Sequence, residues 1–345
     1  NKSINRIKGK NIFKKVSTNI QEGSSPNLKV IELQVVEKPT GEISLGAGAG
    51  TAGATIGGGI KENNFLGKGV KLNTNISLTK KGAKGSFTYE QPNFNYSDNS
   101  LLTSISSTST DNLADFGYKT GETTVALATK FQQYDNLYFT PQLKSSYENL
   151  ETTSKASTSL KKQEGNYFDT YFNYALDLDY RNNSYQPTDG TRYTFNQELP
   201  IISDSSELLN TVIVSSYKLL AYDMVGKISV YGSTIGTLSG KDVRISKRAY
   251  IPSNRLRGFE NGKVGPIENL KHIGGNNVTT INMSTTLPQI LPSFENTDFS
   301  LFFDAANIWG VDYDSTIKDN KKIRSSTGIA MDVLTPIGPL SFSWA

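Results

Sequence analysis

The chain has 345 residues, with 36 basic and 32 acidic side chains and a net charge of +4. No apolar run reaches the about 18 residues that a spanning helix needs, which excludes a helical membrane protein. The lack of Cys excludes thiol catalysis, disulfides and Cys-zinc sites, and a lone histidine, His272, excludes most His-based triads. Basic and acidic residues are mixed along the chain, so nucleic acid is not an expected partner. Plentiful Tyr, Thr, Ser and Asn favour a β-rich fold.

The first 41 residues differ in pattern from the rest. Residues 1–16 are compatible with a short helix, and residues 13–21 and 28–36 have the pattern of two strands around a turn. Two strands and one helical turn cannot hold a core alone. We therefore expect residues 1–41 to be the end of a small α+β module that begins upstream.

From Glu42 onward, apolar and polar side chains alternate in segments of about 10 residues or more, the pattern of membrane-spanning strands. In residues 168–181, one face carries Phe168, Phe172, Leu176 and Leu178, and the other carries Asp169, Asp177 and Asp179. Residues 298–309 repeat the pattern, with Phe303 on one face and Asp304 on the other. An apolar face of this length predicts a lipid-facing wall, and the polar face predicts a lumen.

The spacing of turn signals supports a transmembrane barrel. Short connections are predicted on one rim and longer polar connections on the other, which is the asymmetry of outer-membrane barrels. We count fifteen strands between residues 42 and 345, and an odd number predicts that one closing strand is missing after Ala345. The short connections are predicted at residues 63–68, 92–99, 134–136, 186–190, 223–224, 291–296 and 335–336, and the longer ones near 110–115, 145–165, 200–206, 238–275 and 310–320.

The longest connection, residues 238–275, contains eight Lys or Arg residues against three acidic ones. Composition alone favours an exposed basic loop, but a connection of this length is rarely a simple linker. Its centre is Leu256-Arg257-Gly258-Phe259, which places a cation, a glycine and a large aromatic in succession. This pattern favours a loop tip that packs against another part of the protein.

These four residues resemble the (V/I/L)RGF signature of the BamA-type outer-membrane assembly factors and their TamA, mitochondrial and chloroplast relatives. Other family-like segments follow in the same order along nearly the whole chain. They are Val36-Glu37-Lys38-Pro39-Thr40-Gly41 at the domain junction, Asn63-Asn64-Phe65-Leu66-Gly67-Lys68-Gly69 and Gln91-Pro92-Asn93-Phe94 at turns, Pro187-Thr188-Asp189-Gly190, Gly274-Gly275-Asn276, Phe303-Asp304 with Trp309, and Thr335-Pro336-Ile337-Gly338-Pro339-Leu340.

The resemblance implies an all-β fold, a transmembrane antiparallel β-barrel of the bacterial surface antigen type. The family form has 16 strands, so residues 42–345 would be a barrel without its last strand, and residues 1–41 the C-terminal part of the last POTRA domain. It implies an integral protein of the cell outer membrane with its N-terminal part in the periplasm. The implied function is non-covalent insertion and folding of β-barrel proteins. The implied partners are nascent outer-membrane β-barrel proteins, outer-membrane lipids and assembly-complex lipoproteins.

The resemblance also implies the site residues. In the family, the RGF loop folds into the barrel and its Arg contacts acidic residues of the inner wall, so Arg257 is expected to pair with Asp304. The neighbouring strand usually carries a second acid, and counting forward places Ser284 there, which leaves the cage incomplete. The lateral seam is expected at the first strand, where Gly46, Gly48 and Gly50 provide little packing.

Other interpretations have weaker support. Residues 46–50 resemble a dinucleotide-binding loop, but neither a following helix nor a βαβ unit is predicted. Asp169, Asp177 and Asp179 suit the polar lining of a lumen better than a metal or acid/base set, so no enzyme activity, metal or cofactor is expected. The competing function is an outer-membrane channel or a two-partner secretion pore, which shares the RGF loop but exports soluble protein.

Overall fold

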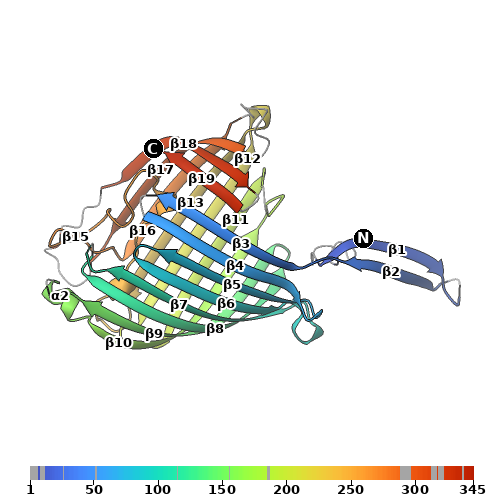
Figure 1. Ribbon diagram of the computed structural model, residues 1–345, viewed down its shortest axis with the longest axis horizontal. Helices are drawn as coiled ribbons and strands as arrows, with labels where there is room; N and C mark the ends of the chain where they lie inside the picture. The colour runs from blue at the N-terminus through green and yellow to red at the C-terminus, as the bar shows by residue number, and fades with distance from the viewer. Residues whose placement is uncertain are drawn as a thin grey trace.

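The computed structural model describes most of the chain (Figure 1). The described residues are 7, 12–25, 27–50, 53–114, 116–154, 156–184, 187–287, 297–311, 317, 322–335 and 338–345. The helix expected within residues 1–16 and the turn expected at 291–296 fall wholly or largely outside this set, as does most of the connection expected at 310–320.

Among the described residues, the barrel part is one antiparallel sheet of fifteen strands, as the turn spacing predicts. Each strand pairs with its sequence neighbours, except that β13 pairs with β16 across the long connection, which contains the short hairpin β14 (Ile267–Glu268) and β15 (Lys271–His272). The strands are β3 (Gly41–Gly50), β4 (Gly53–Phe65), β5 (Val70–Thr79), β6 (Gly82–Gln91), β7 (Ser100–Asn112), β8 (Tyr118–Tyr134), β9 (Leu137–Thr152), β10 (Gly165–Asp179), β11 (Gly190–Ile202), β12 (Glu207–Leu219), β13 (Val225–Thr237), β16 (Asn277–Thr286), β17 (Thr297–Trp309), β18 (Arg324–Thr335) and β19 (Gly338–Trp344).

The sheet curls around a lumen, so that β3 and β19 approach one another (Figure 1). These two strands are the edges of the sheet, and the described residues form no hydrogen-bonded ladder between them. The architecture is therefore a barrel-like antiparallel sheet with two free edges.

Side chains alternate between the lumen and the outer face along each strand. In β10, Phe168 is 54% exposed whereas Asp169 is fully buried, and in β17 Phe303 is 42% exposed whereas Asp304 is fully buried. The exposed large side chains belong to the outer face, and the buried carboxylates contact residues of the long connection within the lumen. The alternation predicted for these two strands is confirmed, because a strand points successive side chains to opposite faces of its sheet.

The two rims differ in the length of their connections. One, here the turn rim, carries the short connections 66–69, 135–136 and 220–224, and the other, here the loop rim, carries the longer connections 153–164 and 238–276. The predicted asymmetry is only partial, because the turn rim also has the longer connection 180–189 and the loop rim the short connections 80–81 and 203–206. The loop expected at 145–165 is shorter than predicted because β9 continues to Thr152.

The N-terminal hairpin consists of β1 (Phe13–Glu22) and β2 (Lys29–Glu37), close to the two strands predicted there. It is a separate two-stranded sheet and extends away from the barrel at the turn rim (Figure 1). Within the described part of the chain, no helix has the length and apolar character needed to cross a bilayer.

Candidate functional site

The long connection between β13 and β16 fills part of the lumen instead of extending from the loop rim. Two groups of buried apolar residues hold it against the inner wall. One joins Ile245 and Ile273 of the loop to Phe116, Tyr118 and Leu150. The other joins Ile251 and Leu256 of the loop to Val278, Ala306 and Ile308 of β16 and β17.

Arg257 forms the expected contact with Asp304. The guanidinium donates through Nε to Oδ2 at 2.7 Å and through Nη2 to Oδ1 at 2.8 Å, which is a bidentate, charge-assisted pair. The backbone N–H of Arg257 adds a third bond to Oδ2 at 3.1 Å. The guanidinium also lies 3.5 Å from the ring centroid of Phe302. Asp304 thus fixes both the side chain and the backbone of the loop tip.

The residue of β16 that reaches Asp304 is Asn282, and not Ser284, which was expected at the position where the family has its second acid. Asn282 is paired with Asp304 across the ladder, whereas Ser284 is paired with Phe302. The Asn282 amide donates to Asp304 Oδ1 at 2.7 Å and to the Arg255 carbonyl at 2.8 Å. The side chain across the ladder from Asp304 is therefore a neutral amide, and the Arg257–Asp304 pair carries one positive and one negative charge.

The other residues of the motif shape the loop tip. Leu256 is buried among the apolar residues of β16 and β17, and Phe259 packs on the same group. Gly258 has φ of +82°, a conformation that favours glycine, and a Cβ there would lie 2.6 Å from the Cβ of Ala345. A side chain at this position would therefore require both backbone strain and movement of the chain end.

A second ion cluster fixes the start of the loop, and the sequence did not predict it. Arg244 Nη2 lies 2.6 Å from Asp169 Oδ2 and 3.4 Å from Glu207 Oε1, and Nη1 lies 3.1 Å from Glu148 Oε2. The four side chains are at most 2% exposed. The Tyr167 ring covers the guanidinium at 4.0 Å. Because β9, β10 and β12 each supply one carboxylate, Arg244 ties one loop residue to three strands.

The carboxylates around Arg244 have further donors. Ser203 donates to Asp169 at 2.6 Å, and the Tyr171 hydroxyl donates to Glu207 at 3.1 Å. Lys247 donates to Glu122 at 2.6 Å and lies 3.9 Å from Glu148. Burial alone would lower the pKa of Lys247, but the attraction of these two carboxylates outweighs burial and leaves its pKa raised.

The sequence contained a partial signal for this cluster. Asp169 was assigned correctly to the lumenal face of its strand, but eight cations in the loop offered eight possible partners. The two other acids of that face pair locally. Asp177 is bound by Arg192 and Asp179 by Arg181, each through a 2.7 Å ion pair.

The edge strand β3 has little side-chain cover. A Cβ built at Gly46 or Gly48 would find no atom within 4 Å. Gly50 ends the strand, paired with Gly53 of β4. The strand is therefore hydrogen-bonded along β4 but weakly packed, which leaves its other side as an available edge.

Comparison with known proteins identifies the family. The chain is structurally similar to BamA from Haemophilus ducreyi lacking POTRA domains 1–3, with a TM-score of 0.79, 24% identity, and coverage of 99% of this chain and 73% of that one. It is also similar to CdiB from Acinetobacter baumannii, with a TM-score of 0.62, 12% identity, and coverage of 94% of this chain and 60% of that one. CdiB from Escherichia coli matches with a TM-score of 0.56, 11% identity, and coverage of 94% of this chain and 61% of that one. The model of the Omp85 superfamily domain matches residues 64–345. This protein therefore belongs to the Omp85 superfamily of outer-membrane β-barrel proteins.

Proposed function

We propose that this protein inserts and folds other β-barrel proteins in the outer membrane, using the edge of β3 as a template. The observation that carries the proposal is the free edge of β3, where Gly46 and Gly48 have open space around them. An incoming strand can pair with such an edge by β-augmentation. Pairing would satisfy its backbone N–H and C=O groups before they enter lipid, where an unpaired group costs several kcal/mol.

The anchoring of the loop is consistent with a movable edge. Arg244 is held by β9, β10 and β12, and Arg257 is held by β17. None of these strands is β3, so the edge strand can separate without breaking either ion cluster. We propose that the loop keeps the opposite wall in one arrangement while the edge opens.

The remaining parts of the proposal concern location and partners. We propose that residues 1–41 are the end of a POTRA domain and lie in the periplasm, and that residues 42–345 form the barrel domain. Nascent outer-membrane proteins would be the clients, with assembly lipoproteins as accessory partners. A secretion pore for soluble protein is the second candidate, and the likeness to CdiB is the observation that favours it.

Site-specific photocrosslinking tests the proposal. A photoreactive amino acid would replace Ile43 or Leu45 on β3, and Ile105 or Val125 on the outer face of β7 and β8 would serve as matched controls. We expect newly made outer-membrane barrel proteins to crosslink at β3 and not at the control positions. Equal capture at all four positions would contradict edge pairing, and capture of a soluble exported protein within the lumen would favour the secretion pore.

A disulfide that locks the edge of β3 tests whether client assembly needs that edge to open. Gly48→Cys paired with a cysteine on β19, the other edge strand, which contacts β3, would lock the two edges by a disulfide, and the chain has no native Cys to compete. We expect client assembly in reconstituted vesicles to stop in the oxidised protein and return with reductant. A pore would keep translocating with its edge locked, because its lumen is unchanged.

A further inference from the structure

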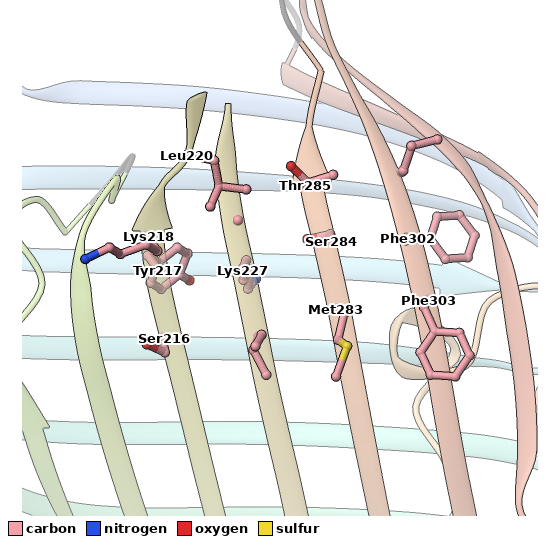
Figure 2. Close-up of a pocket in the computed structure, with 13 residues that line it drawn as sticks. Ser216, Tyr217, Lys218, Leu220, Lys227, Met283, Ser284, Thr285, Phe302 and Phe303 are labelled. Atoms are coloured by element: carbon pink, nitrogen blue, oxygen red, sulfur yellow. The ribbon is translucent and has the colours of Figure 1, made fainter. Parts of the chain in front are cut away.

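The outer wall near the turn rim contains an apolar groove of about 480 Å³, within the size range of small-ligand sites (Figure 2). It lies on β12, β13, β16 and β17. The register of these strands explains its shape, because two outward-facing rows of side chains cross them. The row farther from the rim contains Ser216, Ile228, Met283 and Phe303, and the row nearer the rim contains Lys218, Gly226, Thr285 and Leu301.

The groove exists because the row nearer the rim has small residues at its centre. Gly226 has no side chain and Thr285 is short, so the wall is recessed between Lys218 on one side and Leu301 on the other. On the rim side, Leu220 leaves the end of β12 and folds over Gly226. A Cβ at Gly226 would lie 3.1 Å from Leu220 Cδ1. Gly226 is therefore the floor of a recess covered in part by Leu220.

The groove faces away from the lumen. On β12 and β13, the lumenal side is marked by the hydrogen bond between Ser215 and the buried Ser229, at 3.0 Å. Ile228, the residue before Ser229, points to the opposite, outer face of β13 and is 49% exposed. Near the rim, the Val225 N–H donates to the Thr286 hydroxyl at 2.7 Å, which joins β13 to β16 behind the groove. The groove is thus a recess in the wall and not a passage into the lumen.

We propose that this groove binds an acyl chain of an anionic diacyl phospholipid in the leaflet at the turn rim. The outer wall of a membrane barrel faces hydrocarbon, so an alkyl-lined recess in it is matched by an alkyl chain. Lys218 is an exposed cation on the outward-facing row at the edge of the groove, and among the described residues it makes no salt bridge. Lys227 also lines the groove and is exposed, but it belongs to the opposite face of β13, where its ammonium lies 5.6 Å from the centroid of the Tyr217 ring. A lysine at a membrane rim extends its ammonium toward the interface, where an anionic headgroup lies. Asp223, in the turn beyond Leu220, is the nearest acidic residue along this hairpin.

A lipid bound in the groove would lie directly behind the strands that hold the loop residue Arg257. Met283 and Phe303 face the groove. On the inner face, their direct neighbours are Asn282 and Asp304, of which Asp304 binds Arg257 and Asn282 donates to Asp304. A bound chain would therefore support the same stretch of β16 and β17 that carries the Arg257 contact. The binding site itself depends only on the outer-membrane location of the superfamily, so it stands or falls separately from the proposed insertase function.

Photoactivatable phospholipids with a diazirine on one acyl chain test the site. The full protein would be reconstituted in bilayers containing either labelled phosphatidylglycerol or labelled phosphatidylcholine, and the labelled positions found by mass spectrometry. We expect phosphatidylglycerol to label residues around Ile228 and Met283 above the level of the outer wall at Ile105. Uniform labelling around the barrel would overturn the proposal.

Two matched leucine substitutions make the test specific. Gly226→Leu fills the groove, and Gly232→Leu makes the same change on the outer face of the same strand, where a Cβ meets no atom within 4 Å. Groove labelling should fall to the level of the remaining wall in Gly226→Leu and persist in Gly232→Leu. Thr285→Leu fills the recess without displacing Leu220 and replaces Gly226→Leu if that variant does not fold. Unchanged labelling in a folded filling variant would overturn the acyl-chain site.

The charge of Lys218 is tested separately. In Lys218→Gln, the preference for phosphatidylglycerol over phosphatidylcholine should fall by about five-fold, which corresponds to about one lysine near an anionic surface. Lys218→Arg should retain the preference. If the original protein labels equally with both lipids, the anionic part of the proposal is wrong.

Discussion

The Arg257–Asp304 pair gives the sharpest test of how the loop is held. Arg257→Met removes two charge-assisted hydrogen bonds and the contact with Phe302, and it leaves without its cation a carboxylate that is fully buried in the original protein. Two donors remain, the backbone N–H of residue 257 and the Asn282 amide. Breaking a buried pair by removing one partner typically costs about 3–5 kcal/mol.

The expected cost for this pair lies below that range. The Arg257 side chain is 21% exposed, so water reaches part of the site when the guanidinium is lost, and the two remaining donors still stabilise the carboxylate. We therefore expect a loss of about 2–3 kcal/mol in the free energy of unfolding. The measurement is urea unfolding of the purified protein in detergent micelles, followed by the mobility difference between folded and unfolded forms in gels.

A double-mutant cycle separates the pair from general damage. Asp304→Asn removes the charge that Arg257→Met leaves unpaired, so the double variant should lose about 1–2 kcal/mol less than the sum of the two single variants. Arg257→Lys keeps the charge but loses the bidentate geometry, and should fall between the original protein and Arg257→Met. Strict additivity, or an Arg257→Met variant as stable as the original, would refute the reasoning.

Three further outcomes follow from the same structure. Arg244→Met leaves three buried carboxylates without their cation and should cost about 3–5 kcal/mol in the same unfolding assay, whereas Arg181→Met at a partly exposed pair should cost about 1 kcal/mol or less. Burial, with the positive charge of Lys263, lowers the pKa of His272. Protonation of His272 therefore costs more when the loop is packed in the lumen than when the loop is released into water. Stability should then decrease as pH falls below about 6.5, measured by proteolysis within the loop, and His272→Gln should remove that dependence. Phe172→Arg on the outer face should destabilise the barrel by about 2–4 kcal/mol if it lies near the membrane midplane, and equal tolerance of arginine at Phe172 and at an exposed loop position would contradict a lipid-facing wall.

The sequence alone determined the strand pattern of the barrel and the faces of its clearest strands. The alternation within residues 168–181 and 298–309 assigns Phe303 to the outer face and Asp304 to the lumen, because the side-chain period of a strand is fixed at two. The RGF-like motif and Asp304 were identified as partners from the family resemblance together with this alternation. Turn residues and strand lengths are local properties, so the count of fifteen strands is also within reach of sequence.

Only the tertiary structure decided which residues meet across strands. Residues 145–152 were predicted to be loop because they are largely polar, but they form the end of β9. Their polarity has a tertiary cause, because Glu148 on the lumenal face of this segment pairs with Arg244 of the loop. The choice of Asn282 over Ser284 depends on the register between β16 and β17, which no local pattern encodes. The groove beside Gly226 likewise depends on four strands aligned in register. Contacts of this kind join residues far apart in the chain, and they are fixed by the way the sheet curls around the loop.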